Sequence, residues 1–344
     1  MANVSQGVRL AQIPVGLLAA FAVASMVAGC GKVEKEEVAA VASSGGCKRS
    51  TEKTIGWDFP LAHIGLAAPF NNRVKQFAEK RGYKVLTSGN TGDLQKQVND
   101  LNTWINQGLP AIAAYALEPS SIEPVAAQAR AKCVGFVSYS YSVDMKNQDA
   151  SVQLDWKRNG EMLGQSALAW VASHPGKQFN VLILNNRDLS AGILRDDGLN
   201  AVFPGNDPNI KVIATQKAGD RATGEKVTST VLQAHPDLNM VLAFNDDVAL
   251  GARQAFLNAG KKDDDPLIYI GGQDGSPDAL KVLKEGTLLR AIVATSANEV
   301  AAGVANTTID VAEGKKPETP VLKAETLTAA DGAKIDDYLS QFSN

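Results

Sequence analysis

The 344-residue sequence predicts an α/β protein made of two doubly wound lobes, with one ligand cleft between them. Short apolar runs alternate with stretches of helical spacing, which is typical of βαβ units and a parallel sheet. The alternation starts again near Asp155, so the unit is expected twice. The length and the 44% hydrophobic content allow two ordinary domains, and the net charge of −3 offers no basic surplus for nucleic acid.

In the first half of the chain, apolar runs bounded by turn residues predict strands, and runs of helical period predict the helices between them. Gly82 and Gly108 end two of these helices. The expected elements are a strand at 54–59, a helix at 70–81, a strand at 83–87, a helix at 93–107, a strand at 111–116, a helix at 122–132, a strand at 134–139 and a short strand near Val152.

The second half repeats the pattern after Asp155. The expected elements are a helix at 160–173, a strand at 180–184, a helix at 192–202, a strand at 210–215, a helix at 224–234, a strand at 240–244, a helix at 248–260, a strand at 267–270 and a helix from about Ser276.

The strand at 240–244 is followed directly by polar residues. Its five residues are all apolar, as in a strand buried on both faces of a parallel sheet. Asn245 then stands at the carboxyl tip, where open α/β sheets bind ligands, and an amide that both donates and accepts suits a hydroxyl. Asp246 or Asp247 is expected to cap the next helix. The alternative is an Asn245 that only closes the turn.

A second polar pair, Gln273 and Asp274, follows the strand at 267–270. A carboxylate at this place accepts ligand hydroxyls through charge-assisted hydrogen bonds, which are the strong ones. The alternative role for Asp274 is to cap the following helix, but Ser276 is better placed for that.

The N-terminus carries an export signal in place of a folded element. Arg9 precedes an Ala-rich apolar run that ends in Val-Ala-Gly before Cys30. This ending resembles a bacterial lipobox, which implies a signal peptide at 1–29 and a lipid on Cys30. The alternatives are an uncleaved anchor or a chance cysteine. Residues 30–53 are expected to form a tether, because they are charged or small and lack large apolar residues.

Catalytic and metal-binding patterns are absent from the sequence. It contains no GxGxxG, GxxxxGK[ST], HExxH or GxSxG motif, and the cysteines form neither a CxxC pair nor a zinc spacing. The Asp263-Asp264-Asp265 run lacks the ligand spacing of a calcium loop and is interpreted as a solvated turn. We therefore expect no metal, no cofactor and no enzymatic activity.

Several motifs together resemble the type I periplasmic sugar-binding proteins, the group that contains the ribose- and galactose-binding proteins. They are Lys80-Arg81-Gly82-Tyr83, Leu117-Glu118-Pro119, Asp155 with Gly160 and Gly164, Arg195 with Gly198, Ala234-His235-Pro236-Asp237, Phe244-Asn245-Asp246, Ala249-Leu250-Gly251-Ala252 and Asp274-Gly275-Ser276-Pro277-Asp278.

The resemblance implies two Rossmann-like lobes joined by three crossings, near Gln153, Thr295 and Thr326. It also implies a helix at 298–312 that returns to the first lobe. The N-terminal lobe would hold 54–153 and 296–321, and the C-terminal lobe 154–295 and 322–344. It also implies a monomer that binds a small carbohydrate or polyol and delivers it to an ABC transporter permease. Together with the lipid on Cys30, this places the protein at the periplasmic or extracellular face of the membrane.

By the same resemblance, the ligand contacts in the second lobe are Asn245 and Asp274. Other positions depart from the family and are candidates because they stand at strand ends or next to a family contact: Gln273, Tyr115, Ser138, Tyr139, His63, Asp58 and Arg187. Ile193 stands where the family often has an arginine that contacts the sugar, and Arg187 with Asp188 could substitute for it.

Leu66, Ala67 and Gly219 replace aromatic residues on which such proteins stack a sugar ring. Residues that could rebuild a platform are Trp57, Phe59, Tyr139 and Tyr141. A site with fewer stacking faces also suits an open-chain polyol, so a tetritol or pentitol is preferred over a pentose.

Two other classes share this core. A sugar-responsive repressor needs a DNA-binding segment where this chain has a signal and tether, and an enzyme needs a catalytic set that is missing here. A sensing protein that presents its ligand to a membrane receptor stays open as the alternative to transport. For Cys47 and Cys133 two states also stay open: a disulfide, or two free thiols.

Overall fold

The computed structural model describes residues 47–64, 66–140 and 147–342. The predicted signal peptide, Cys30, most of the tether and Tyr141 lie outside the described residues.

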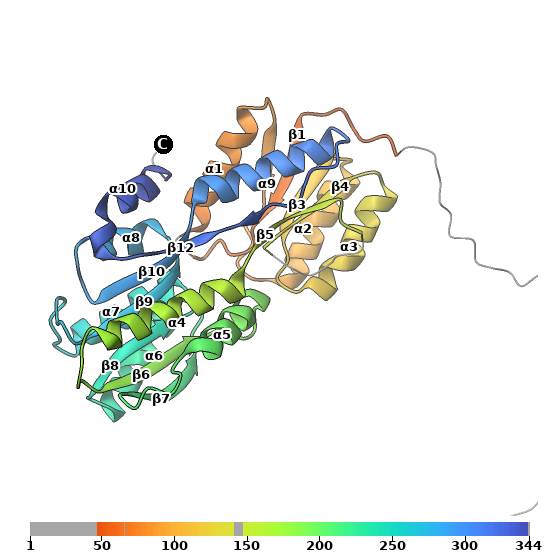
Figure 1. The fold of residues 1–344 in the computed structure, drawn as a ribbon. Helices are drawn as coiled ribbons and strands as arrows, with labels where there is room; N and C mark the ends of the chain where they lie inside the picture. The colour runs from red at the N-terminus through yellow and green to blue at the C-terminus, as the bar shows by residue number, and fades with distance from the viewer. Residues whose placement is uncertain (1–46, 65, 141–146, 343–344) are drawn as a thin grey trace, which may run out of the picture. The chain divides into compact units, whose positions relative to one another are not determined.

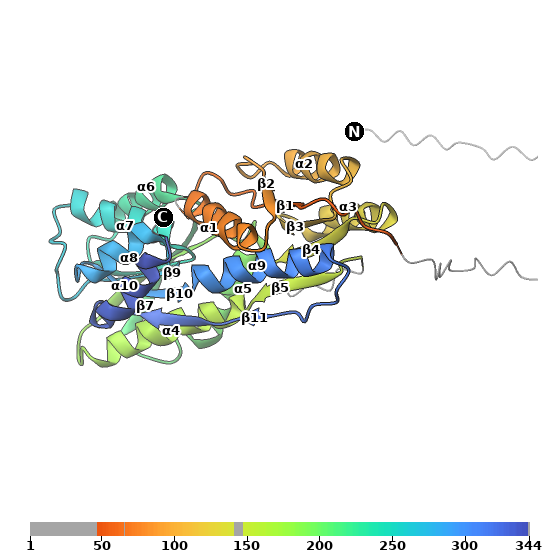
Figure 2. The ribbon, with the colours of Figure 1, turned by 90° about the horizontal axis from the view of Figure 1, so that it is seen from above.

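The first sheet is parallel throughout and has the order β11-β5-β4-β3-β1-β2. Its strands are β1 (Thr54–Asp58), β2 (Lys84–Thr87), β3 (Ala111–Tyr115), β4 (Gly135–Tyr139), β5 (Ala150–Leu154) and β11 (Val321–Leu322). Helices α1 and α9 cover one face and α2 and α3 the other (Figures 1 and 2). Their bounds are α1 (Ala67–Glu79), α2 (Leu94–Asn106), α3 (Pro119–Ala131) and α9 (Ala297–Ala312).

The second sheet has the order β12-β10-β9-β8-β6-β7 and is parallel except for β12. Its strands are β6 (Phe179–Asn185), β7 (Ile210–Lys217), β8 (Leu238–Ala243), β9 (Tyr269–Asp274), β10 (Leu289–Thr295) and β12 (Ala324–Leu327). Helices α4 and α5 lie on one face and α6, α7 and α8 on the other, followed by α10. Their bounds are α4 (Trp156–Ala172), α5 (Ser190–Val202), α6 (Arg221–Ala234), α7 (Asp246–Asn258), α8 (Pro277–Lys284) and α10 (Gly332–Ser340).

The same winding therefore occurs twice, and the predicted two-sheet α/β fold is confirmed. The chain passes between the sheets after β5, after β10, and at Lys323 between β11 and β12, the last a little before the crossing expected at Thr326. Strands β10, β11 and β12 were not among the predicted elements. Arg290 interrupts the apolar run of β10, and β11 and β12 are too short to show a period.

The predicted helix starts at Gly160, Gly192 and Gly224 lie inside α4, α5 and α6, which begin earlier in the structure. Gly160 of α4 and Gly198 of α5 let the two backbones touch: a Cβ on Gly160 would lie 1.9 Å from the carbonyl oxygen of Arg195. Gly251 of α7 has the same role against Arg221 of α6, at 2.1 Å. These glycines are required by close helix packing, so treating Gly160 as a helix start shortened the prediction.

Residues 47–53, assigned above to the tether, are fastened to the first sheet. Cys47 and Cys133 form a disulfide, the first of the two predicted states. Arg49 donates to the carbonyl oxygen of Val311 at 2.7 Å and pairs with Asp149 at 2.5 Å. This end of the chain is therefore part of the folded lobe.

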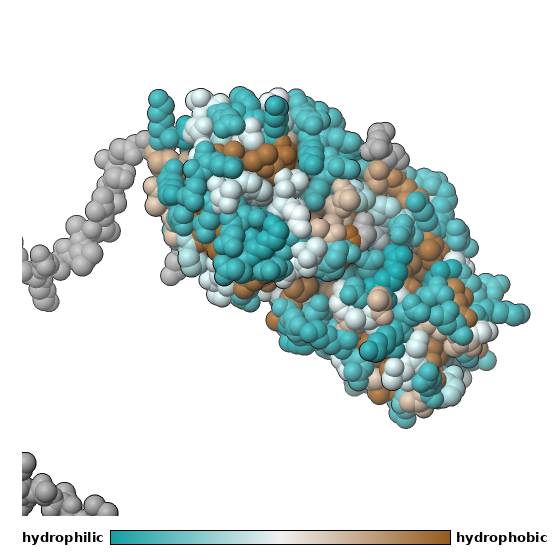
Figure 3. Space-filling view, turned by 180° about the vertical axis from the view of Figure 1, so that it is seen from behind, coloured by the Kyte–Doolittle hydropathy of each residue, from teal (hydrophilic) through white to brown (hydrophobic). Residues whose placement is uncertain are grey.

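The outer surface is largely polar, as the face in Figure 3 shows, and the large apolar side chains exposed in the described part are Leu86 and Val321. Of the helices in the described ranges, none is both long and apolar enough to span a membrane.

Candidate ligand-binding site

The carboxyl ends of strands from both sheets border a cavity of about 510 Å³. This is the place where open α/β sheets hold ligands. The first sheet and its loops contribute Phe59, Leu61, His63, Ile64, Leu66, Gly92, Leu94, Tyr115, Leu117, Glu118 and Tyr139. The second sheet and its helices contribute Trp156, Asn186, Asp188, Leu189, Ala191, Arg195, Lys217, Gly219, Asp220, Phe244, Asn245 and Asp274.

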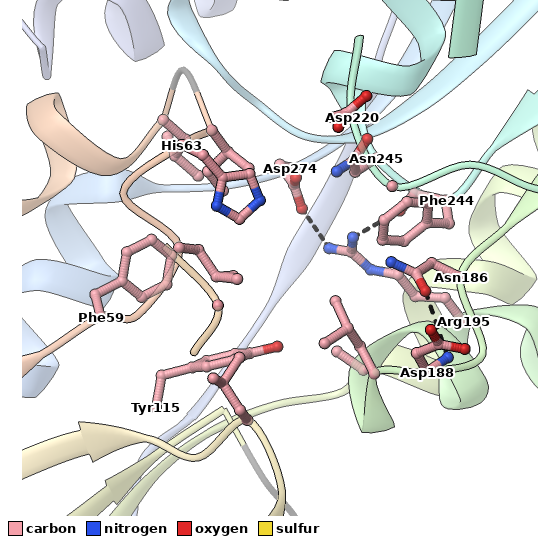
Figure 4. Close-up of a pocket in the computed structure, with 18 of the residues that line it drawn as sticks. Phe59, His63, Tyr115, Asn186, Asp188, Arg195, Asp220, Phe244, Asn245 and Asp274 are labelled. Carbon is pink, nitrogen blue, oxygen red and sulfur yellow. Dashed lines mark hydrogen bonds and ion pairs between the residues drawn. The ribbon is translucent and has the colours of Figure 1, made fainter. Parts of the chain in front are cut away.

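Arg195, on α5, is the buried cation of the cavity (Figure 4). One guanidinium nitrogen donates to the carbonyl oxygen of Phe244 at 2.6 Å, and another pairs with the Asp274 carboxylate. The guanidinium lies 4.4 Å from the ring centroid of Trp156, a cation–π contact. Its Nε–H is buried and has no partner in the described residues.

Asp274 ends β9 with φ of +130°, a conformation that L-residues rarely adopt. Arg195 is the described residue that hydrogen-bonds to its carboxylate, through Oδ1. Burial raises the pKa of Asp274, and the charge of Arg195 opposes that rise. The second carboxylate oxygen is left as an acceptor at the cavity wall.

Asn245 caps α7: its side-chain oxygen accepts the backbone N–H of Val248 at 2.9 Å. The prediction that Asp246 or Asp247 caps this helix is therefore wrong. Ser276 precedes α8 without making a side-chain cap bond, so that expectation also fails. Because the Asn245 oxygen is engaged by the helix, its NH₂ group is what it offers to the cavity.

The wall from the first sheet is mostly apolar and aromatic. The ring centroids of Phe59 and Tyr115 are 5.7 Å apart, and those of Tyr115 and Tyr139 are 6.1 Å apart. Leu66 and Leu117 extend this surface. Trp57 lies beneath it, fully buried, and stacks on Phe59 at 5.9 Å. The cavity thus has an aromatic wall from the first sheet, and a polar wall from the second sheet faces it.

At the rim, His63 from the first lobe and Asp220 from the second face the same space (Figure 4). The Asp220 oxygen accepts the backbone N–H of Thr223, and this bond, with a smaller effect of His63, lowers the pKa of Asp220. Lys217 and Asp188, which also line the cavity, form an exposed ion pair.

Five of the predicted ligand contacts line the cavity: Asn245, Asp274, Tyr115, Tyr139 and His63. Four do not, and each has another role. Gln273 is buried beside Asp274 and points to the opposite face of β9, where its amide donates to Ala243. Ser138 likewise points to the opposite face of β4 from Tyr139, and its hydroxyl donates a hydrogen bond to the Gln148 side chain. Arg187 pairs with Asp196 and Asp197 on α5.

Asp58 lies behind the wall and is fully buried. Its carboxylate accepts hydrogen bonds from Ser88 and from the side chain of Gln97. Gln97 in turn donates to the carbonyl oxygen of Tyr115 at 2.7 Å and accepts the N–H of Leu117 at 3.1 Å. Burial raises the pKa of Asp58 from 3.8 to about 6. Asp58 therefore supports the Tyr115–Leu117 turn from behind and does not reach the cavity.

Arg195 was predicted as a family motif residue but not as part of the site, and Trp156 and Phe244 were not predicted to line it. The apolar–polar pattern gave no signal for Arg195, because a charged side chain inside an amphipathic helix is ordinarily solvent-exposed. No group of His, Cys, Asp or Glu side chains in the described ranges is arranged to hold a metal ion. The arrangement offers hydrogen bonds to hydroxyl groups on one side and an apolar surface on the other.

Two doubly wound sheets that share one such cavity define a two-lobed ligand-binding protein. A family model described as a periplasmic binding protein domain matches residues 55–316. The chain belongs to this family.

Two curated relatives and one solved structure illustrate the likeness. The ribose import binding protein of Bacillus subtilis (strain 168) is 30% identical over 80% of this chain and 88% of its own length. The xylitol-binding protein of Mycolicibacterium smegmatis (strain ATCC 700084 / mc(2)155) is 27% identical over 67% of this chain and 64% of its own length. The crystal structure of a galactofuranose binding protein is 25% identical, with a TM-score of 0.76, and covers 84% of this chain and 99% of that one.

Proposed function

We propose that this protein binds a small neutral sugar alcohol or monosaccharide in the cavity between its sheets and delivers it to the permease of an ABC importer. The observation that carries the proposal is the opposition of two unlike walls. Arg195, Asp274 and Asn245 offer donors and an acceptor for hydroxyls, and Phe59 and Tyr115 offer an apolar surface for carbon atoms. Polyhydroxylated solutes have both kinds of surface.

The relatives support the same class. One is named for ribose import and another for binding xylitol, a sugar alcohol. An import name favours transport over the sensing alternative. Family membership also supports the expectation that the protein is a binding protein and not an enzyme.

Within this class we favour an open-chain polyol. Leu66 and Gly219 line the cavity at places where the family resemblance implies aromatic rings. A pyranose or furanose would lose those stacking contacts, whereas a flexible pentitol depends more on its hydroxyl contacts.

We also propose that the protein is an exported lipoprotein, with a signal peptide at 1–29 and a lipid on Cys30. The proposal includes the lobe boundaries predicted above and a monomeric protein. The N-terminal cysteine follows from the lipobox-like sequence. Mass spectrometry of the membrane-extracted protein tests it: an unmodified chain that begins at Met1 would contradict the lipoprotein.

Thermal unfolding with candidate ligands tests the binding function. A ligand present at about 100 times its dissociation constant adds roughly 2.7 kcal/mol to stability. We expect such a stabilisation from xylitol or another pentitol, and a smaller one from the matching pentose at the same concentration. Sugar acids serve as controls, because the buried cation Arg195 is already paired with Asp274. If no tetritol, pentitol, pentose, hexose or cyclitol raises the melting temperature, the proposed function is wrong.

A further inference from the structure

Asp246 occupies a buried position beside the ligand site that its place in the sequence does not explain. It is the first residue of α7, yet Asn245 caps that helix. The Asp246 side chain is 1% exposed and does not line the cavity. Its Oδ2 accepts two backbone N–H groups, from Gly275 at 2.9 Å and from Ser276 at 2.6 Å. These are the two residues that follow Asp274.

The Asp274 backbone needs such support. Its φ of +130° is strained for any residue with a Cβ, and strained residues persist only where the surrounding structure over-determines them. Arg195 fixes the carboxylate, but a side-chain contact does not fix the peptide. The two N–H bonds to Asp246 hold the turn immediately after Asp274, and so hold its backbone from the other side.

The neighbouring strand leaves room for this arrangement. A Cβ on Gly272 of β9 would lie 2.8 Å from Oδ1 of Asp246 and 3.1 Å from the Cβ of Ala249. The glycine therefore lets the carboxyl group of α7 pass against β9 and reach the turn. The close approach fits only if residue 272 has no side chain.

We infer that Asp246 is a positioning residue of the ligand site: through the Gly275 and Ser276 N–H groups it holds Asp274 in the orientation that binds the ligand. This inference rests on the proposed function, because it assigns a role within the same site. Asp246 acts through Asp274 and touches no ligand itself. Its effect on affinity must therefore disappear when the Asp274 carboxylate is removed.

Asparagine is the conservative replacement at this position. Burial and the nearby Asp274 raise the pKa of Asp246 well above its usual value, which disfavours a full charge here. An Asn side chain has the same size and keeps one oxygen to accept both N–H groups. Alanine removes the acceptor and leaves two buried donors unpaired.

Isothermal calorimetry with xylitol on Asp246→Ala, Asp246→Asn, Asp274→Ala and the double alanine variant tests the inference. We expect Asp246→Ala to weaken binding tenfold or more and Asp246→Asn to stay within about threefold of the wild type. The double variant should bind no more weakly than Asp274→Ala alone. The matched control is Asp278→Ala, an exposed carboxylate at the start of α8 outside the cavity, which should bind like the wild type.

Wild-type affinity in Asp246→Ala, with only a lower melting temperature, would show a purely structural role and overturn the inference. Penalties that add in the double variant would do the same. If Asp246→Ala does not fold, Gly272→Ala is measured in its place, because the added methyl group displaces the Asp246 carboxyl without removing it. Wild-type affinity in Gly272→Ala also overturns the inference. If the wild type does not bind xylitol, the same variants are titrated with the sugar or polyol that stabilises the wild type. A wild type that binds no tetritol, pentitol, pentose, hexose or cyclitol refutes the proposed function instead, so the two failures are distinguishable.

Discussion

Replacing Asp58 by asparagine should stabilise the protein at neutral pH. Asp58 is fully buried and bonded to Ser88 and Gln97. An Asn side chain can turn its oxygen to the Gln97 amide and donate its NH₂ to the Ser88 hydroxyl, so both bonds are kept. What the substitution removes is the charge that a buried aspartate must carry at pH 7.

The size of the effect follows from the raised pKa of Asp58, which moves from 3.8 to about 6 through burial. A folded-state pKa above the unfolded value means that the folded protein holds the proton more tightly. The stability contributed by Asp58 is therefore complete below pH 3.8, is lost as the pH rises to 6, and changes no further above that. At about 1.4 kcal/mol per pKa unit, the ionised side chain costs roughly 3 kcal/mol at pH 7.

Urea unfolding of the wild type and Asp58→Asn at pH 4 and pH 7 measures this cost. We expect the variant to be more stable at pH 7 by up to about 3 kcal/mol and nearly equal to the wild type at pH 4. Its affinity for the ligand should be unchanged, because Asp58 supports Gln97 and does not line the cavity. A variant that is less stable than the wild type at pH 7, or a difference that does not depend on pH, would refute this explanation.

Three further predictions concern the site and the disulfide. Asn245→Ala should weaken ligand binding about tenfold or more and lower the stability of the unliganded protein by about 1 kcal/mol, whereas Asn245→Ser should keep the helix cap and lose only affinity. Calorimetry measures the affinity and urea unfolding the stability; wild-type affinity in either variant would contradict the ligand contact. Arg195→Lys should weaken binding by about 1–3 kcal/mol, because a lysine cannot bridge Phe244 and Asp274 as the guanidinium does; unchanged affinity would contradict its role. Cys47→Ser should lower the free energy of unfolding by up to about 4–5 kcal/mol, the chain-entropy limit for a cross-link of this span. In urea unfolding the variant should match the reduced wild type, and a variant as stable as the oxidised wild type would contradict a stabilising disulfide.

The sequence alone determined the alternation of strands and helices, its repetition, and the two polar strand tips at Asn245 and Asp274. These are local properties: a buried parallel strand needs a continuous apolar run, and a helix needs its period. Both features can be recognised without knowing what any segment touches. The family resemblance then indicated which strand tips face a ligand, and both of these residues line the cavity.

Only the tertiary structure decided which neighbouring side chains share that cavity. Successive residues of a strand point to opposite faces, so Tyr139 and Asp274 line the cavity and their neighbours Ser138 and Gln273 do not. The tertiary structure also brought in Arg195 of α5, whose guanidinium contacts Trp156 of α4 and pairs with Asp274 of β9. Contacts between segments far apart in the chain leave no period in the sequence, and for that reason packing alone determined them.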